Sequence, residues 1–406
     1  MIPKSHTGSS GPAPSFFRVR SALVFCAPMM VNGIAMPYFP VWLEGLKMNE
    51  TEIGFILAVP MVLRIISAPL VSVLADRIGE RADILIWSGI LSLTSAILLL
   101  YTHSFWLIAL VFGLQGAVYA PFVPVTEALL MTGVRRWGFD YGHMRLWGSL
   151  AFIIATVAGG YAVGQYGGDL VLPAMMLGFC LTVIAGVIAP RVGKPVAKPD
   201  PVPGTAHKKS ALKDRDFLAL LVGVSLSGSS HAMLFAFSAI YWQQLGFSGT
   251  AIGLLWSAGV FAEIVVFVFS RWLVARISLW VLIFSGLVIA IFRWILFPEL
   301  TSFSALFALQ CLHAFTFATA HIGIQNMIVR RVEAEQEASA QGLYFFFNGL
   351  FMALSTLLSG YAYETFGLRG FYAMSVVSAI GLSFAIWAYI HQPQSDGSGG
   401  KTMLAE

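Results

Sequence analysis

Apolar stretches of about twenty residues recur along almost the whole chain, and each is long enough to cross the hydrocarbon core of a bilayer as an α-helix. Only 11% of the 406 residues are charged and the mean hydropathy is +0.79, whereas water-soluble domains carry far more charge. We count twelve such stretches: 18–43, 52–75, 83–101, 105–131, 145–165, 170–189, 217–242, 251–272, 277–297, 302–329, 340–363 and 370–391. The sequence therefore predicts an all-α polytopic membrane protein with twelve transmembrane helices.

The basic residues predict the orientation of the chain. With the N-terminus in the cytoplasm, twenty of the 24 Lys and Arg fall in cytoplasmic tails, loops and helix ends. Two, Lys47 and Arg369, then fall outside, and two, Arg64 and Arg293, lie within spans. This split follows the positive-inside rule and places both termini in the cytoplasm. It also accounts for the basic residues without nucleic acid, which we do not expect as a partner.

A polar segment rich in Pro and Lys, residues 191–216, separates six stretches from the other six. Its composition predicts a cytoplasmic linker between an N-terminal bundle, 18–190, and a C-terminal bundle, 217–391. Residues 1–17 are rich in Ser, Gly and Pro and lack an apolar core, so we expect a flexible tail there rather than a cleaved signal. We expect a second flexible tail at 392–406.

The two halves of the chain resemble each other. "WLEGLKMNETEIGFIL" from Trp42 parallels "WQQLGFSGTAIGLLW" from Trp242, and "GGYAVGQYG" from Gly159 parallels "SGYAYETFG" from Ser359. Such repetition is typical of secondary transporters, in which the substrate site lies between the repeats near the middle of the membrane. We therefore expect two pseudo-symmetric bundles of six helices.

Cysteine usage predicts neither a disulfide framework nor a metal cluster. Cys26, Cys180 and Cys311 each lie within an apolar stretch, and we interpret them as small buried residues.

The loop between the second and third stretches, "SVLADRIGER" (Ser72–Arg81), resembles the loop motif of the major facilitator superfamily, although its first glycine and one basic position differ. The resemblance implies that Asp76, Arg77 and Arg81 help to gate the cytoplasmic side. An ordinary solvated loop is the alternative.

Further segments narrow this resemblance. Four are similar to the 3-phenylpropionate transporter family: "DYGHMRLWGSLAF" (Asp140–Phe152), "FSAIYWQQLGFS" (Phe237–Ser248), "LLWSAGVFAEIVVF" (Leu254–Phe267) and "LHAFTFATAH" (Leu312–His321). "MPYFPVWL", Met36–Leu43, resembles the first helix of the lactose/proton permease. The resemblance implies the major facilitator fold and proton-coupled uptake, and it suggests an aromatic carboxylate as substrate.

Ionisable side chains within the spans are functional candidates because they are costly to hold in a membrane. Burial of Glu263 would favour its protonated form, and a nearby arginine would favour release of the proton. Glu263 is therefore our expected proton carrier, and a static bridge to an arginine is the alternative.

Arg293 and His313 resemble residues of the lactose permease proton site. That family has a glutamate one turn after the histidine, where this chain has Thr316. We therefore expect His313 to act as a relay or substrate ligand rather than as part of a copied proton route. His321, about 12 Å further along the helix at ~1.5 Å per residue, is predicted to be a lower relay or a hydrogen-bonding residue between helices.

Three charged residues are predicted to contact the substrate. Glu127 and Arg145 resemble the sugar-binding ion pair of the lactose permease, although a gating bridge or a helix-end anchor would use the same residues. Arg64 lies near the middle of its span, and its guanidinium offers a planar fork to a carboxylate. A structural pairing of Arg64 with an acid on another helix is the alternative.

Other polar and aromatic side chains within spans are candidates for the wall of a substrate cavity, while packing is the alternative for each aromatic residue. These are His231, Asn32, Gln115, Asn348, Tyr119, Trp256 and Phe317.

Together these features predict a proton-coupled importer of a small organic acid, such as 3-phenylpropionate, that works by alternating access. A proton symporter of a neutral sugar or nucleoside is the second hypothesis. A membrane-embedded enzyme or receptor is remote, because the chain has no H-E-x-x-H or G-x-S-x-G motif and no nucleotide-binding loop. We expect a monomer in the bacterial inner membrane, with the proton as coupling ion and no other cofactor.

Overall fold

The computed structural model describes residues 12–78, 81–192, 211–333 and 336–392, with only the backbone path given for 68–78, 81, 211 and 338. Where these residues have regular structure, it is helical. The N-terminal half contains α1 (Phe17–Gly45), α2 (Glu50–Ile78), α3 (Arg81–Leu100), α4 (Phe105–Tyr119), α5 (Phe122–Trp137), α6 (Tyr141–Tyr166) and α7 (Val171–Ile188). The C-terminal half contains α8 (Arg215–Ser229), α9 (Ala232–Gln244), α10 (Gly249–Val268), α11 (Ser270–Arg276), α12 (Leu279–Leu296), α13 (Phe303–Cys311), α14 (Ala320–Arg331), α15 (Glu337–Phe366) and α16 (Phe371–His391).

Short 3₁₀ turns occupy four of the connections, at Gly168–Leu170, Ala211–Lys213, Phe297–Glu299 and Gly367–Gly370. Ten stretches of the described residues are long and apolar enough to cross a membrane. The all-helical prediction is therefore confirmed for the part of the chain that the structure covers. Most of the expected linker and of both tails lies outside the described residues.

Four of the predicted stretches are interrupted. The fourth divides into α4 and α5 at Pro121, which has no backbone N–H to continue the helix. The seventh divides into α8 and α9 at Ser230 and His231. The eighth divides into α10 and α11 at Phe269. The tenth continues from α13 to α14 through a π-helical turn, Ala314–Thr319. Such turns are rare, and they frequently mark functional sites.

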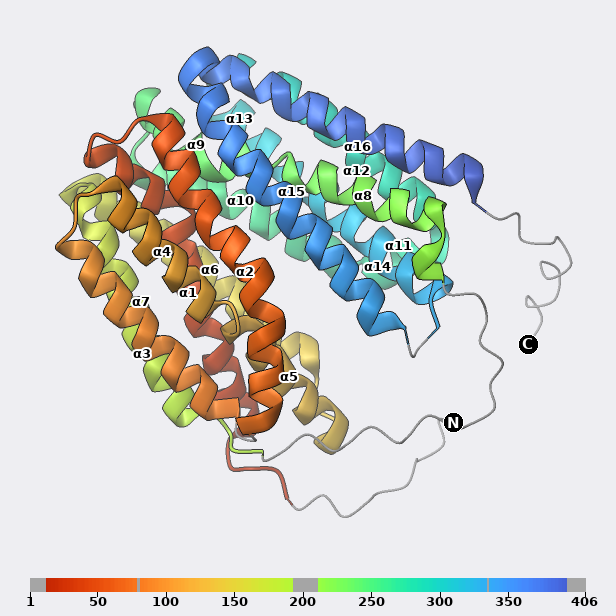
Figure 1. The fold of residues 1–406 in the computed structure, drawn as a ribbon, viewed down its shortest axis with the longest axis horizontal. Helices are drawn as coiled ribbons and strands as arrows, with labels where there is room; N and C mark the ends of the chain where they lie inside the picture. The colour runs from red at the N-terminus through yellow and green to blue at the C-terminus, as the bar shows by residue number, and fades with distance from the viewer. Residues whose placement is uncertain (1–11, 79–80, 193–210, 334–335, 393–406) are drawn as a thin grey trace, which may run out of the picture.

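The helices of each half form a group, and the two groups diverge from one end of the molecule to the other (Figure 1). At the end where they meet, which we call the closed end, a Cβ atom on Gly249 of α10 would lie 1.9 Å from the carbonyl oxygen of Gly160 in α6. Likewise, a Cβ on Gly54 of α2 would lie 2.8 Å from the Cα of Gly360 in α15. Glycine at these positions lets helices from the two halves approach backbone to backbone.

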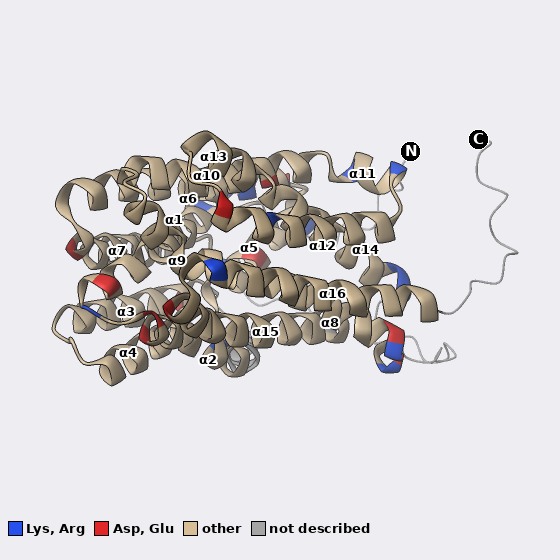
Figure 2. Ribbon diagram, turned by 90° about the horizontal axis from the view of Figure 1, so that it is seen from above, with Lys and Arg blue, Asp and Glu red and all other residues tan. Residues whose placement is uncertain are grey.

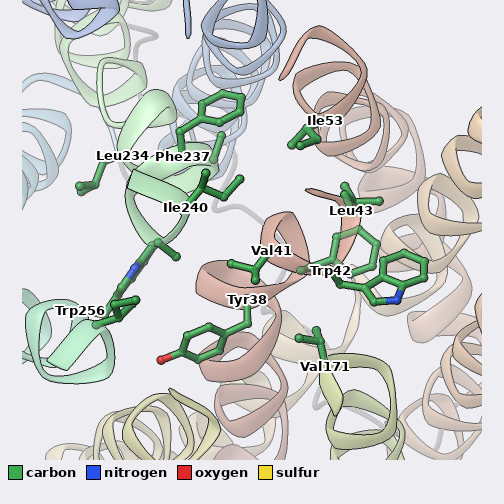
Figure 3. Packing of buried hydrophobic residues seen from close by; sticks show 14 of the residues in the cluster. Tyr38, Val41, Trp42, Leu43, Ile53, Val171, Leu234, Phe237, Ile240 and Trp256 are labelled. Carbon is green, nitrogen blue, oxygen red and sulfur yellow. The ribbon is translucent and has the colours of Figure 1, made fainter. Parts of the chain in front are cut away.

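A hydrophobic core common to both halves fills the closed end. Tyr38 and Trp42 of α1 and Ile53 of α2 belong to the same cluster as Phe237 and Ile240 of α9 (Figure 3). Toward the opposite end, which we call the open end, each half has a separate core. The space between the halves is therefore reached from the open end.

Lys, Arg, Asp and Glu are sparse along the helices (Figure 2). Many large hydrophobic side chains of the helices are exposed. This corrects our interpretation of the cysteines as buried. Cys180 is exposed, and Cys26 and Cys311 are half-buried; all three are free thiols. In a membrane protein an apolar residue can face lipid as well as the core, so an apolar stretch does not establish burial inside the protein.

Candidate functional site

A cavity of about 170 Å³ lies between the two halves of the molecule. The N-terminal half contributes Met36 of α1 and Phe152 of α6, while α9, α10, α13 and His313, the residue before the π-helical turn, supply the rest. Its wall consists of Met36, Phe152, Leu234, Phe235, Trp256, Gly259, Val260, Glu263, Gln310 and His313. Because a cavity of about 150 Å³ holds benzene, this volume suits a ligand with a single aromatic ring.

The polar side chains of this wall come from the C-terminal half. Oε2 of Glu263 in α10 lies 3.7 Å from Nε2 of His313. Gln310 of α13 lies three residues before that histidine in the chain. The close packing of α10 on this region depends on Gly259, where a Cβ would lie 3.3 Å from the Cβ of His313. A carboxyl, an imidazole and an amide are thus presented together to the cavity.

Arg293 of α12 lies behind this polar wall and is completely buried. Its Nη2 donates to Oε1 of Gln310 at 2.6 Å, and its Nη1 donates to Oγ1 of Thr316 at 3.2 Å and lies 3.3 Å from Nδ1 of His313. Arg293 forms no ion pair with Glu263, because His313 lies between them. The structure therefore brings Glu263, His313 and Arg293 into one cluster, but it does not contain the direct Glu–Arg bridge that was our alternative for Glu263.

Thr316 joins this cluster to His231, which begins α9. Oγ1 of Thr316 lies 2.9 Å from Nε2 of His231, whose Nδ1 lies 3.1 Å from the carbonyl oxygen of Gly228. His231 is buried behind the cavity wall. In this conformation His231 would therefore act on a substrate only through a neighbouring residue, and not by the direct contact that we predicted.

The two histidines of the tenth stretch belong to one column of rings. The ring of His313 stacks on that of Phe317, and the ring of Phe317 stacks on that of His321, with 5.6 Å between centroids at each step. The π-helical turn brings these three side chains into line. His321 also meets the ring of Phe267 in α10 edge to face. His313, Phe317 and His321 therefore lie on one face of the tenth stretch.

Glu127 of α5 and Arg145 of α6 form the predicted ion pair, with Nε of Arg145 3.2 Å from Oε1 of Glu127. The hydroxyl of Tyr141 donates to the other oxygen, Oε2, at 2.6 Å. The side chain of Arg145 is half exposed, and its charge also acts on Glu263 and His321 of the opposite half. Arg145 is therefore within electrostatic range of the C-terminal half.

The start of α6 fixes the position of this pair. Asp140 caps the helix by accepting a hydrogen bond from the backbone N–H of His143 at 2.8 Å. That hydrogen bond holds the pKa of the Asp140 carboxyl below its usual value.

Arg64 lies on α2 with an exposed side chain and, among the described residues, has no ion-pair partner. Its neighbours Leu63 and Ile65 contact Gly113 of α4 and Gly349 of α15. Arg64 therefore projects from the side of α2 opposite the exposed Val62 and Ile66, which is the inner side. It does not line the cavity.

The remaining predicted residues are dispersed. Gln115 is buried and donates to Oγ of Ser95 at 2.9 Å, and Tyr119 hydrogen-bonds Thr182 at 3.3 Å, so both contribute to packing within the N-terminal half. Trp256 lines the cavity, whereas Asn32 and Asn348 are half-buried and do not. The gating candidates Asp76, Arg77 and Arg81 have side chains outside the described residues.

A family model described as "MFS_1 like family" matches residues 26–374, which is most of the chain. The chain belongs to this family. Its curated relatives include a probable 3-phenylpropionic acid transporter of Escherichia coli (strain K12), 28% identical over 85% of this chain and 91% of the relative. They also include a lactose permease of Citrobacter freundii, 23% identical over 88% of this chain and 89% of the relative.

Among solved structures, the nucleoside transporter NupG is similar in fold, with a TM-score of 0.73 at 15% identity over 92% of this chain and 98% of that one. The predicted membership of the major facilitator superfamily is confirmed. This member of the MFS_1 like family is an integral multi-pass membrane transporter, and its family and relatives are not enzymes.

Gln310 was not among the residues predicted from the sequence, although it both holds Arg293 and lines the cavity. A signal was present, because it is a polar residue inside an apolar stretch, three positions before His313. Phe152 and Phe235 were missed for a different reason. They are two of 32 phenylalanines, and nothing in the sequence distinguishes those that line a cavity from those that pack.

Proposed function

We propose that this protein is a proton-coupled symporter that imports an aromatic carboxylate, of which 3-phenylpropionate is the first to test. The cavity between the halves carries the proposal. Its volume suits one aromatic ring, its apolar residues offer the ring a surface, and Glu263, Gln310 and His313 offer partners to a polar group. The relative named as a probable 3-phenylpropionic acid transporter supports the same substrate class.

Proton coupling is assigned to Glu263, which is the acidic residue among the described side chains of the cavity wall. An acid in this position can bind and release a proton while substrate occupies the cavity. His313 would connect Glu263 to Arg293, so that a change of charge at Glu263 is transmitted into the C-terminal half. Arg64 and Arg145 would attract the anionic substrate into the space between the halves.

The transport cycle we propose is alternating access between two bundles of six helices, with twelve membrane crossings and both termini in the cytoplasm. The open end would face the cytoplasm, and the closed end would face the outside of a bacterial inner membrane. Opening at the closed end would require separation of the glycine contacts between α6 and α10 and between α2 and α15.

A neutral sugar or nucleoside is the second candidate substrate. The ion pair of Glu127 with Arg145 favours it, because that pair resembles the sugar-binding pair of the lactose permease, and relatives of this chain include a lactose permease. A nucleoside transporter shares the fold.

Uptake into vesicles containing the purified protein and a pH-sensitive dye tests both candidates. We expect 3-phenylpropionate, and not a disaccharide or a nucleoside, to carry protons into the lumen. Transport of the disaccharide with protons would support the second candidate instead. Glu263→Gln should retain exchange of labelled for unlabelled substrate and lose uphill accumulation, whereas unchanged accumulation would remove Glu263 from the proton role.

A further inference from the structure

Within the polar cluster at the cavity wall, the two charged side chains, Glu263 and Arg293, balance without a ligand. Glu263 contributes one negative charge when it is ionised, and Arg293 contributes one positive charge. The hydrogen-bonding residues between and behind them are Gln310, His313, Thr316 and His231, which are neutral when the imidazoles are unprotonated. Lysine and arginine are both missing from the described residues of the cavity wall. An anion that entered alone would therefore leave this cluster between the helices with an unbalanced negative charge.

The same wall offers one place for a carboxylate. The apolar residues Met36, Phe152 and Phe235 occupy the other parts of the wall and suit the ring of an aromatic acid. The carboxylate would then point toward Glu263, Gln310 and His313. Two carboxylates confined to one such site cannot both stay ionised, because each disfavours the charge on the other.

We propose that the carboxylate of the bound substrate lies beside Glu263 and that the two groups share a single proton. This inference rests on the proposed function, because it requires a carboxylate substrate. One proton from solvent enters with each anion, an O–H bond forms on one of the two carboxylates, and the other accepts a hydrogen bond from it. On release, the proton and the anion leave together, so the charge of the protein is the same before and after each cycle.

Other titratable and charged groups also face Glu263, and their arrangement favours Glu263 as the partner of the substrate. His313 faces it at 3.7 Å, but the guanidinium of Arg293 lies 3.3 Å from the other ring nitrogen and would repel a second positive charge. Arg145 acts on Glu263 from α6, but it is paired at 3.2 Å with Glu127.

Two other histidines, His231 and His321, lie near this cluster. His231 lies behind His313, with 5.1 Å between their ring centroids, and His321 lies beyond Phe317 in the ring column. Neither lines the cavity.

Proton uptake measured on ligand binding distinguishes two cases. A shared proton is taken up only with a ligand that has a carboxylate, whereas an independent coupling site binds its proton with any ligand. Calorimetric titrations at about pH 8, in buffers of different ionisation enthalpy, measure the protons taken up per ligand bound. With the unaltered protein, we expect about one proton with 3-phenylpropionate and close to none with 3-phenylpropanamide, which has the same shape and no charge. Affinity for the acid should fall about tenfold per pH unit in this range, because one proton is linked to binding.

Glu263→Gln gives the second part of the test. Without the Glu263 carboxyl, the positive charge of Arg293 is uncompensated. The anion 3-phenylpropionate should therefore bind without proton uptake. At about pH 8 it should also bind about tenfold more tightly than to the unaltered protein. Binding of the amide shows that the variant is folded. Asp169→Asn, which removes an exposed acid from the loop before α7, should behave as the unaltered protein does.

Equal proton uptake with the acid and the amide would overturn the inference, as would retention of proton uptake with the acid in Glu263→Gln. If that variant does not fold, the comparison of acid with amide in the unaltered protein decides the question. If protons accompany 3-phenylpropionate into vesicles but acid and amide take up protons equally, the proposed function stands and this inference fails. If neither ligand binds, both fail.

Discussion

Thr316 links Arg293 to His231 in the polar cluster behind the cavity. Its hydroxyl accepts from Nη1 of Arg293 at 3.2 Å and lies 2.9 Å from Nε2 of His231. Valine has nearly the same shape without the hydroxyl, so Thr316→Val would leave buried polar groups without a partner, at a cost of about 1–3 kcal/mol. We expect a clearly lower thermal unfolding temperature in detergent.

Thr94→Val is the matched control for this prediction, because Thr94 is exposed and its hydroxyl donates only to the carbonyl of Ile90 in its own helix. We expect little change there. Equal shifts for the two variants would show that Thr316 has no special place in the cluster.

Arg64 allows a second prediction about a single side chain. It lies on the inner side of α2 without an ion-pair partner among the described residues, so its charge is available to an approaching anion. Arg64→Gln should raise KM for 3-phenylpropionate about 3- to 10-fold, equivalent to about 0.7–1.4 kcal/mol, and leave KM for its amide nearly unchanged. Arg369→Gln, at an exposed position of the closed end, is the control. An equal rise for both ligands would argue against an electrostatic role.

Single residues also show how far the sequence carried the candidate site. An ionisable residue in an apolar stretch is visible without a structure, which is why Glu263, Arg293 and His313 could be selected in advance. Their contacts could not, because the sequence does not say which way a side chain points around its helix axis. That direction decides that His313 lies between Glu263 and Arg293. It also decides that His231 is buried.

Among the helices, the contact of α6 with α10 leads to a prediction about opening. A Cβ on Gly249 would lie 1.9 Å from the Gly160 carbonyl oxygen. A leucine side chain at this position therefore cannot fit while α6 and α10 stay in contact. In Gly249→Leu, we expect the distance between spin labels at Tyr166 and Arg369 to increase by several ångströms, as measured by pulsed electron paramagnetic resonance. Gly45→Leu is the control, because no atom lies within 4 Å of a Cβ there. An unchanged distance in Gly249→Leu would mean that α6 and α10 rearrange locally instead.

The helices themselves were the most predictable part of the fold, since each apolar stretch must satisfy its backbone hydrogen bonds internally in a membrane. The break at Pro121 followed from proline chemistry. The π-helical turn, Ala314–Thr319, could not be predicted in the same way, because it packs against another helix. A Cβ on Gly286 of α12 would lie 3.0 Å from the Phe315 carbonyl oxygen. This close contact between helices cannot be predicted from the residues around the turn alone.

For the whole molecule, the sequence predicted two halves from their repeated motifs but not how the halves stand relative to each other. Alternating access requires that one chain be stable in more than one arrangement, so the pattern of apolar residues must be compatible with each of them. The core that joins Tyr38 of α1 to Phe237 of α9 at the closed end belongs to one of these arrangements. The sequence therefore predicts the two bodies, and the structure adds which ends are in contact.

The space between the halves opens toward one side of the membrane, and thiol labelling can identify that side. Arg64 is exposed on the inner side of α2, the shared core seals the closed end, and we propose that the open end faces the cytoplasm. In a chain whose native cysteines are replaced by serine, Arg64→Cys should react with a membrane-impermeant thiol reagent in inside-out vesicles and be protected in right-side-out vesicles. Asp169→Cys, in the loop before α7 at the closed end, should show the opposite preference. Labelling of Arg64→Cys from the outside alone would reverse the proposed orientation, because the sealed end would then have to face the cytoplasm.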